Sequence, residues 1–491
     1  MTPPPRALRL AGGSPIWHYG PGADSPQLLV LQPLFEEMNR TRALVAALCR
    51  GLAARGVGCW LPDLPGTGED RRDLRDVTWA DWCDAILQAG GLIAETTGVQ
   101  AWSLAIRGGA LLDAAATEQW RLAPASGASL LRDLQRAGLT GEAMAGYDVP
   151  DSLRHGLAAA TCEVGPAVRT LRLTGDERPA DARVDGPALW RRSEPASDGS
   201  LATALVEDVL AWLPSDRAGE DGLAGADAEH GPHHDDGRTL TTIPLDGGWI
   251  AATIDGPARA THGWLFVTGG SQTRVGPNRL YEHLAAVLAA RGESVIRFDR
   301  RGTGDSPGED RGFEESAPEI AAAAAALRAY SPRLAHLSGF GLCDGATALA
   351  LHGQAAGIDR IVAANPWVVE ATTDAPAAAA VRAHYRERLL DPSAWARLLK
   401  GGVDLRRLAR SLGGAARRDD TSLAAAFARG VPAGSTLVLA GGDNTARAFA
   451  DAWGRLPATP AVETITVATR SHSFAGADAR DALAAALTRQ R

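Results

Sequence analysis

The sequence has few cysteines and no long apolar run. Its 491 residues include five cysteines, and none of them belongs to a C-x-x-C pair. Scattered cysteines form neither a disulfide framework nor a zinc pattern, and they are typical of a reducing compartment. A membrane-spanning helix needs about 18 or more consecutive apolar residues, and no such stretch occurs. The opening residues 1–6 also lack the apolar core of a secretory signal. We therefore expect a cytoplasmic protein without membrane insertion.

Positive charge is also in short supply. The chain has 58 acidic residues against 50 Lys and Arg, which gives a net charge of −8. A nucleic-acid partner normally requires a basic face, so the balance argues against one. The hydrophobic fraction of 45% and the charged fraction of 22% are those of an ordinary globular protein. Because domains typically contain about 100–200 residues, this length predicts more than one.

A polar, acidic and glycine-rich stretch divides the chain at residues 216–238. Its composition is typical of a flexible linker. Three histidines and two aspartates cluster within it: His230, His233, His234, Asp235 and Asp236. Such a cluster can hold a metal ion adventitiously, but a solvated linker explains it better. We expect no metal and no cofactor.

Segments of the first half reappear in the second half, 236 positions further along. Residues 52–56, Leu-Ala-Ala-Arg-Gly, fall on an identical stretch at residues 288–292. The turn at 63–68 falls on 299–304, and both turns end in Gly-Thr-Gly. The repeat predicts two copies of one fold, each long enough to bury a core.

Strand and helix signals alternate along the chain. In the first half an apolar run at 27–32 precedes a helical period at 39–55 and a second apolar run at 57–61. Alternation of this kind predicts a mostly parallel sheet with helices on both faces. The fold class is therefore α/β, with tandem domains at 1–215 and 239–491.

Helical stretches interrupt the alternation once in each half, at residues 123–164 and 377–412. We expect each to form a helical cap over the edge of its sheet. Because the two stretches differ in position and length, the two halves need not bind the same ligand.

The second half contains a G-x-C-x-G pattern, Gly341-Leu342-Cys343-Asp344-Gly345. A strand-like run precedes it and an Ala/Leu run suited to a helix follows it. That is the setting of a nucleophile elbow, a sharp strand-to-helix turn that lifts one side chain above a sheet. The N-terminus of the following helix would favour a thiolate at Cys343. The alternative is a buried structural cysteine in a glycine-rich turn.

An acid and a histidine follow Cys343 in the chain order of the α/β-hydrolase triad. Asp443 follows one strand-like run, and His472 lies in a loop after the next. His472 would take the thiol proton or hold the thiolate as an ion pair, and Asp443 would orient the imidazole. The alternatives are a simple turn at Asp443 and a surface loop at His472.

Backbone N–H groups are expected to stabilise the oxyanion that forms when the thiolate attacks an acyl carbonyl. One donor would be Asp344, directly after the nucleophile, and the other Gly270 or Ser271 in a glycine-rich turn. Five further residues either line the pocket or serve only packing and surface: Arg274, Asn365, Trp367, His384 and Tyr385. We interpret Asp299 and Asp305, which bracket a glycine turn, as structural.

The first half lacks catalytic groups at the equivalent positions. The shift of 236 places Arg107 on Cys343, and a guanidinium cannot act as a nucleophile. Pro33 falls on Gly269 beside the oxyanion turn and offers no N–H. We therefore predict that residues 1–215 are non-catalytic.

Arg107 has two possible roles in that half. A guanidinium at an elbow can hold an anionic group, a carboxylate or a phosphate. Alternatively, Arg107 pairs with Glu177 or Glu194 and the domain is kept for stability or assembly.

Several segments support a family resemblance. In the second half they are residues 269–276, 297–306, 341–345, 365–368 and 384–385. On these segments the half resembles the exosortase A system-associated hydrolase 1 family of α/β hydrolases, and its elbow is also similar to that of dienelactone hydrolases. In the first half, residues 33–42, 79–82 and 186–190 resemble the companion family, exosortase A system-associated hydrolase 2. The resemblance implies a fused bacterial cytoplasmic hydrolase linked to exopolysaccharide production and the PEP-CTERM/exosortase sorting system.

Three functions remain open from the sequence. The first is an acyl hydrolase of the esterase or thioesterase type, acting on a small-molecule or carbohydrate-linked acyl substrate. The second is an acyltransferase that uses the same acyl-enzyme on Cys343. The third is a non-catalytic scaffold of the export machinery. A scaffold has no need to keep Cys343, His472 and Asp443 within reach of one another, so their geometry discriminates.

Overall fold

The computed structural model describes residues 3–137, 144, 146–162, 167–192, 194–214, 233–235, 237–369 and 422–489. The expected cap at 377–412, with His384 and Tyr385, lies outside these residues, as does most of the expected linker at 216–238. Within the described ranges, no helix has both the length and the apolar character needed to cross a membrane. No group of three or more His, Cys, Asp or Glu side chains among them is arranged to hold a metal ion.

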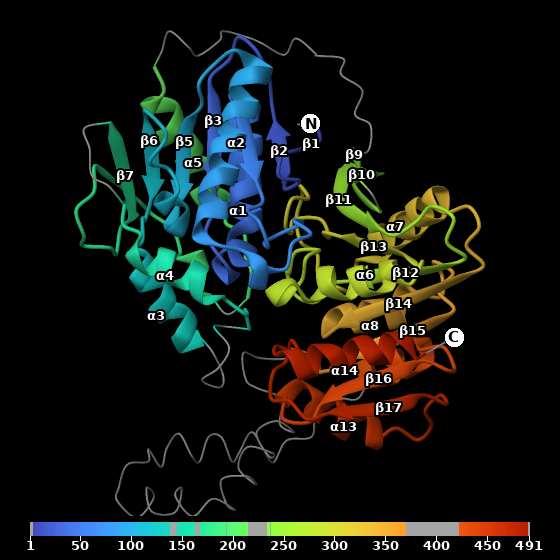
Figure 1. Cartoon of the computed structure of the whole chain (residues 1–491). Coiled ribbons are helices and arrows are strands. Elements are labelled where there is room, and N and C mark those ends of the chain that lie inside the picture. The colour runs from blue at the N-terminus through green and yellow to red at the C-terminus, as the bar shows by residue number, and fades with distance from the viewer. Residues whose placement is uncertain are drawn as a thin grey trace, which may run out of the picture. The chain divides into compact units, whose positions relative to one another are not determined.

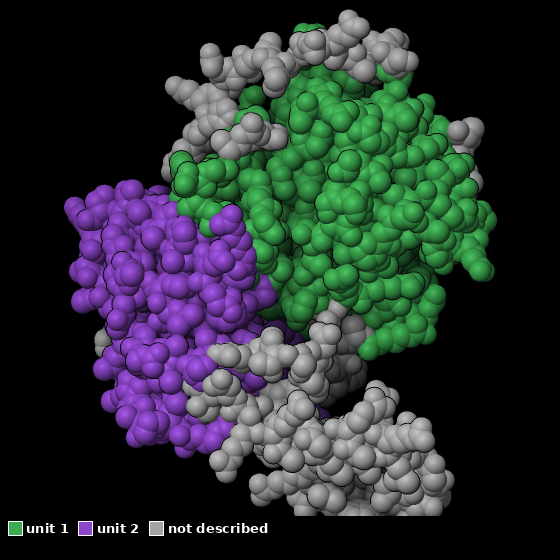
Figure 2. Space-filling view, turned by 180° about the vertical axis from the view of Figure 1, so that it is seen from behind, with its two compact units in different colours: residues 1–256, 271–290, 296–310 green, residues 257–270, 291–295, 311–491 purple. Residues whose placement is uncertain are grey.

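Contacts divide the chain into two compact units. Unit 1 comprises residues 1–256, 271–290 and 296–310, and unit 2 comprises residues 257–270, 291–295 and 311–491 (Figure 2). This division does not follow the linker, because three segments from the second half of the sequence, residues 239–256, 271–290 and 296–310, belong to unit 1. The boundary predicted at residues 216–238 separates the two copies of the sequence repeat, whereas the compact units divide the second copy between them.

The first sheet has eight strands in the order β1-β2-β4-β3-β5-β6-β7-β8 (Figure 1). Their bounds are β1 Arg6–Arg9, β2 Pro15–Tyr19, β3 Gln27–Leu31, β4 Gly58–Pro62, β5 Trp102–Ile106, β6 Gln119–Leu122, β7 Val168–Leu173 and β8 Ala182–Val184. The pairs β1–β2 and β2–β4 are antiparallel, and all later pairs are parallel. The expected strand–helix–strand order at the start of the chain is confirmed.

Helices cover both faces of this sheet, as the alternation predicted. They are α1 Glu36–Ala53, α2 Trp79–Thr97, α3 Gly127–Ala137, α4 Asp151–Ala159 and α5 Gly199–Trp212, with short 3₁₀ turns at Leu74–Asp76, Arg107–Leu111 and Leu189–Arg191. Apolar side chains of α1 and α5 form one core, and those of α2, α3 and α4 form a second. Two of the helices, α3 and α4, fall in the stretch expected to form a cap.

The second sheet has the order β17-β16-β15-β14-β12-β13-β11-β10-β9. Its strands are β9 His233–Asp235, β10 Arg238–Leu245, β11 Gly248–Asp255, β12 His262–Val267, β13 Ser294–Phe298, β14 His336–Leu342, β15 Arg360–Ala364, β16 Thr436–Ala440 and β17 Glu463–Val467. The β12–β14, β14–β15, β15–β16 and β16–β17 pairs are parallel. When read from β10, the order matches the first sheet strand for strand. The repeat in the sequence is therefore a repeat of topology.

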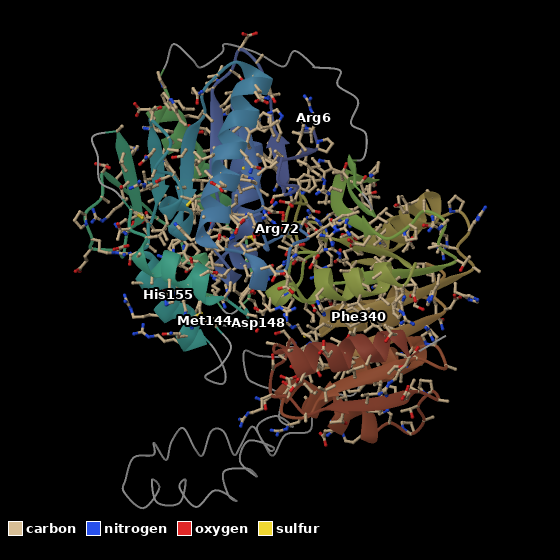
Figure 3. All side chains as sticks on the ribbon, viewed as in Figure 1. Arg6, Arg72, Met144, Asp148, His155 and Phe340 are labelled. Atoms are coloured by element: carbon tan, nitrogen blue, oxygen red, sulfur yellow. The ribbon has the colours of Figure 1, made fainter. Side chains whose placement is uncertain are left out.

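The helices of the second half are α6 Leu280–Ala290, α7 Ala317–Tyr330, α8 Asp344–His352, α12 Ser422–Gly430, α13 Asn444–Gly454 and α14 Ala477–Thr488, and a 3₁₀ turn spans Pro277–Arg279. In unit 2 the central strands β12 and β14 are buried. Phe340 is a residue of β14 in unit 2 (Figure 3). It packs against Phe266 of β12, with ring centroids 4.9 Å apart. This buried centre is the base on which the candidate site of unit 2 stands.

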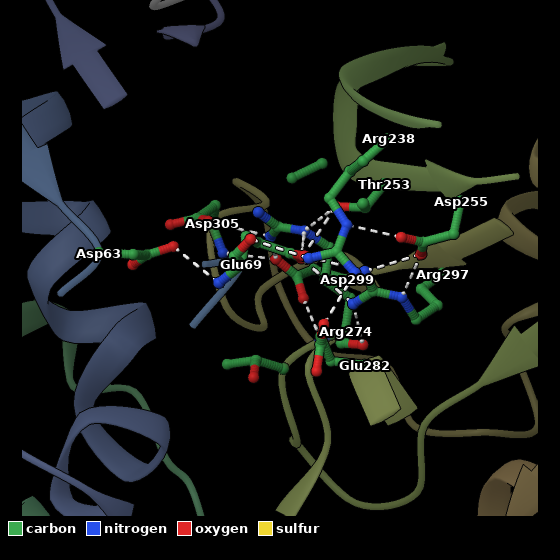
Figure 4. A network of polar contacts seen from close by, with 12 residues as sticks. Asp63, Glu69, Arg238, Thr253, Asp255, Arg274, Glu282, Arg297, Asp299 and Asp305 are labelled. Atoms are coloured by element: carbon green, nitrogen blue, oxygen red, sulfur yellow. Dashed lines mark hydrogen bonds and ion pairs between the residues drawn. The ribbon is translucent and has the colours of Figure 1, made fainter. Parts of the chain in front are cut away.

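Unit 1 contains a buried network of ion pairs whose members come from both halves of the sequence (Figure 4). The Glu69 carboxylate lies 2.8 Å from Arg297, 3.0 Å from Arg274 and 3.8 Å from Arg238. Burial alone would raise the pKa of Glu69, but these three guanidinium groups hold it well below its usual range. These ion pairs join side chains of both halves of the sequence within unit 1.

The two glycine turns, one in each half of the sequence, form the same backbone hydrogen bond to an aspartate. The backbone N–H of Glu69 donates to Asp63 at 3.0 Å, and the backbone N–H of Asp305 donates to Asp299 at 2.9 Å. Arg42 of the first half then contacts Asp305 at 2.7 Å and Asp63 at 3.0 Å. In each half the acid that follows Gly-Thr-Gly, Glu69 or Asp305, thus binds arginine from the opposite half of the sequence. In this structure Asp299 and Asp305 shape a turn and bind arginines, as the structural interpretation expected.

Candidate active site

Cys343 stands on a strained turn between β14 and α8. Its φ of 59° lies in the left-handed region, which costs a residue with a Cβ roughly 1–2 kcal/mol. The positions two residues before and two residues after Cys343 have room only for glycine. A Cβ on Gly341 would lie 2.5 Å from the nitrogen of Ala346, and a Cβ on Gly345 would lie 2.3 Å from the carbonyl oxygen of Val267. The local geometry is that of a nucleophile elbow.

The structure brings the three predicted triad residues together at the carboxyl ends of parallel strands in unit 2. Asp443 follows β16 and His472 follows β17. His472 Nδ1 lies 3.0 Å from Asp443 Oδ2, and the imidazole also hydrogen-bonds the Cys343 sulfur. Because Asp443 engages Nδ1, the other ring nitrogen, Nε2, serves the sulfur. This is the nucleophile–base–orienting acid arrangement.

Hydrogen bonds between side chains and the backbone hold the acid and the histidine in place. Asp443 is also the N-cap of α13, where its carboxylate accepts the N–H of Ala446 at 2.9 Å. Asn365, at the end of β15, donates from its side chain to the carbonyl of His472 at 2.8 Å and accepts the N–H of Ala440 at 2.8 Å. Asn365 was expected either to line the pocket or to serve packing, and its role as the support of the histidine loop was missed. Its position directly after a strand was the only available signal.

The protonation of the pair differs from the expectation of a ready thiolate. Burial raises the pKa of the Cys343 thiol above its ordinary value, and the hydrogen bond from His472 only partly opposes this effect. The Asp344 carboxylate raises the pKa further. Burial alone would lower the pKa of His472, but its hydrogen bonds to Asp443 and Cys343 raise it to about 10. Burial of the sulfur therefore outweighs the hydrogen bonds that favour its thiolate.

The predicted oxyanion donors are both close to the elbow, and each already has a partner. The backbone N–H of Asp344 donates to the Cys343 sulfur. The N–H of Gly270 donates instead to the side chain of Asp344, with 2.5 Å between nitrogen and Oδ1. Ser271, the alternative donor, belongs to unit 1, and its hydroxyl donates to Asp310 at 2.9 Å.

The remaining pocket candidates have other partners. Arg274 is buried in the ion network of unit 1, which agrees with the packing alternative for this residue and not with a place in the pocket. Trp367 lies beside the elbow: its N–H donates to the carbonyl of Cys343 at 3.2 Å, and its carbonyl accepts the hydroxyl of Thr347 at 2.5 Å. Trp367 therefore fixes the backbone of the elbow.

The first half keeps the elbow but changes its chemistry. Arg107 follows β5 with a φ of 55°. Its guanidinium forms two hydrogen bonds with the Glu37 carboxylate, at 2.9 and 3.2 Å, and lies 5.2 Å from the centre of the Trp190 ring. The expected partners were wrong, because Glu177 is exposed and Glu194 accepts a hydrogen bond from another side chain. Glu37 stands in the first turn of α1, which the repeat alone could not align with the elbow.

A cavity of about 360 Å³ adjoins this elbow within unit 1. Six of the residues that line it are Leu34, Glu37, Arg40, Arg107, Leu130 and Trp190. Arg40 donates to the carbonyl of Trp190 at 3.2 Å, while its Nε, although buried, has no hydrogen-bond partner among the described residues. The cavity thus combines apolar walls with a buried ion pair.

Solved structures that resemble the chain match about half of it. An α/β serine hydrolase without a lid from Xanthomonas campestris is 17% identical, and the match covers 53% of this chain and 97% of that one with a TM-score of 0.35. A dienelactone hydrolase from Anabaena variabilis is 17% identical, with 53% and 97% covered and a TM-score of 0.33. A serine hydrolase homologue from Coxiella burnetii is 15% identical, with 52% and 100% covered and a TM-score of 0.35. No protein-family model matches the chain, and no curated protein does either.

Scores of this size carry no argument about activity. The fold assignment rests on the chain itself, on two sheets with the same strand order and two elbows at the same place in that order. The chain consists of two tandem α/β repeats, each with a mostly parallel sheet and flanking helices.

Proposed function

We propose that the second half is a cysteine-nucleophile acyl hydrolase of the esterase or thioesterase type. The observation that carries the proposal is the contact chain from Cys343 through His472 to Asp443 on a strained elbow. The strained backbone at Cys343 costs folding free energy, so a scaffold without chemistry would gain nothing by keeping it. The arrangement therefore favours an enzyme over a scaffold.

In the proposed reaction the Cys343–His472 pair shares one proton, which lies on the imidazole when the sulfur attacks the acyl carbonyl carbon as a thiolate. The carbonyl oxygen becomes an oxyanion, which the N–H of Asp344 stabilises. When the carbonyl re-forms, the bond to the leaving alkoxide or thiolate breaks, and His472 returns the proton to that group. The acyl group is then held on sulfur as a thioester.

Deacylation uses the same residues in reverse. His472 takes a proton from water, and the resulting hydroxide attacks the thioester carbon. Collapse of the second tetrahedral intermediate breaks the carbon–sulfur bond, and the sulfur recovers its proton as the acid leaves. Asp443 holds the imidazole in the required orientation throughout and stabilises its charged form. An acceptor hydroxyl in place of water would make the protein an acyltransferase, and that alternative stays open.

The biological setting is proposed from the sequence resemblance alone. The segments that resemble the two exosortase A system-associated hydrolase families point to a cytoplasmic enzyme linked to exopolysaccharide production. A carbohydrate-linked or small-molecule acyl compound is the proposed substrate class. For the first half we propose a non-catalytic role. The Glu37 partner supports a structural Arg107, and an anionic ligand there would have to displace that carboxylate.

A substrate screen tests the proposed activity. Wild-type protein, Cys343→Ala and a control at the half-buried Cys83, Cys83→Ala, would be assayed on p-nitrophenyl esters and acyl-thioesters of increasing chain length. Turnover by wild type and Cys83→Ala, and none by Cys343→Ala, is the expected result. Full activity in Cys343→Ala would remove the nucleophile assignment, and inactivity of all three proteins would remove the hydrolase proposal.

A further inference from the structure

The residue after the nucleophile places its own carboxylate on an oxyanion donor. The Gly270 N–H points at Asp344 Oδ1 from 2.5 Å, within unit 2. The two segments touch so closely that a Cβ on Gly269 would lie 2.7 Å from the same oxygen and 3.0 Å from the Cβ of Cys343. A carboxylate oxygen therefore sits beside the nucleophile, in the turn where the second oxyanion donor was expected.

A carboxylate oxygen resembles the oxyanion of a tetrahedral intermediate in charge and hydrogen-bonding needs. Oxyanion donors act by pointing N–H groups at an oxygen about 2.7–3.1 Å away. The bond from Gly270 shows that this N–H is available to an anionic oxygen at the elbow, and also that it is not vacant. A hydrogen bond to a charged group is stronger than one between neutral groups, so the substrate oxygen must compete with the Asp344 carboxylate for this N–H.

We propose that Asp344 is an autoinhibitory residue whose carboxylate closes the oxyanion site in the free protein. Acylation of Cys343 requires this side chain to leave the Gly270 N–H, which then binds the substrate oxyanion. The inference rests on the proposed acyl-hydrolase function and adds a regulatory step to it. It also assigns two opposed roles to one residue: the Asp344 backbone N–H supports the oxyanion, and its side chain excludes it.

Two substitutions separate these roles. Asp344→Ala removes the side chain that occupies the donor and keeps the backbone N–H. Asp344→Asn keeps the shape and an acceptor oxygen but removes the charge, so the site stays partly occupied. Both remove the negative charge that disfavours the thiolate, so a second reaction is needed to measure that effect alone.

Iodoacetamide supplies this second reaction. Sulfur displaces iodide from carbon without forming an oxyanion, so alkylation of Cys343 reports the thiolate and not the oxyanion site. Acylation by p-nitrophenyl acetate, followed as the burst of p-nitrophenol, reports both. An oxyanion donor contributes about 10²–10³-fold to a rate. We expect Asp344→Ala to increase acylation at least about tenfold more than alkylation, with Asp344→Asn in between.

The outcomes are distinct. If acylation and alkylation change by the same factor, or if acylation falls in Asp344→Ala, the autoinhibitory role is overturned while wild-type acylation keeps the hydrolase proposal. If neither protein acylates although iodoacetamide modifies Cys343 in both, the hydrolase proposal falls and the inference falls with it.

Hydrogen exchange adds a readout independent of activity. The peptide containing Gly270 should exchange faster in Asp344→Ala at an unchanged melting temperature, and equal exchange would contradict the contact.

Discussion

The two elbows share a backbone and differ in everything that makes a nucleophile. Arg107 and Cys343 have φ values of 55° and 59° at the same place in the strand order of their sheets. Around Cys343, the loops after β16 and β17 supply an acid and a histidine. In the first half, Asp176 follows the equivalent strand β7 but binds Arg178 at 2.6 Å. The turn is thus part of the fold, whereas reactivity comes from the loops that follow later strands.

The largest expected effect is the loss of the base from the reactive elbow. His472→Ala should lower ester or thioester hydrolysis by about 10²–10⁴-fold, because the thiol loses its proton acceptor. The matched control is His336→Ala, which removes an exposed imidazole from the start of β14. Initial rates of the three proteins decide the matter. Equal activity in His472→Ala and wild type would contradict the role of His472 as the base at the Cys343 elbow.

The second effect concerns the network that ties segments of both halves into unit 1. Glu69→Leu leaves three buried guanidinium groups without their shared carboxylate, and breaking a buried pair costs about 3–5 kcal/mol. Arg55→Ala is the control, since its ion pair with Glu207 is about half exposed on both sides. Urea unfolding should show a much lower midpoint only for Glu69→Leu. Equal midpoints would mean that the halves do not depend on this network.

The third effect separates structure from recognition at Arg107. Arg107→Leu leaves Glu37 buried without its partner, so we expect a loss of about 1–3 kcal/mol of unfolding free energy and no change in hydrolysis. Part of the loss should return in the double variant with Glu37→Leu. Calorimetry with phosphate and acetate tests the anion hypothesis. Weaker binding by Arg107→Leu than by wild type would make this elbow a receptor site, and equal binding would leave it structural.

The smallest expected effect is a shift in the pH profile of alkylation. Because burial raises the pKa of Cys343, the thiolate fraction is small at neutral pH and grows as protons are removed. The rate of alkylation should therefore keep rising with pH beyond the point at which an exposed thiol levels off. Asp443→Asn should lower the neutral-pH rate several-fold, since the imidazolium that supports the thiolate loses its carboxylate. A profile that levels off below the ordinary thiol range would contradict the raised pKa.

The sequence was sufficient for the features that are local in the chain. The glycines around Cys343 form a short motif. The order of Cys343, Asp443 and His472 can be read along the chain, and the repeat appears when the two halves are aligned. The strand order of the sheets follows this repeat. Contacts between distant segments carried no such signal. The partner of Arg107 is Glu37, 70 positions away, and the partner of the Gly270 N–H is a side chain 74 positions away. The raised pKa of the nucleophile reflects burial, which short motifs do not encode.

One measurement tests most directly the claim that chemistry resides at only one of the two elbows. Full-length protein would be incubated with p-nitrophenyl acetate, quenched in acid during the burst, and analysed by intact mass and peptide mapping. The account predicts one acetyl group per chain, located on Cys343, and none in Cys343→Ala. Acetylation of another residue at the same rate, or an unchanged adduct in Cys343→Ala, would contradict it.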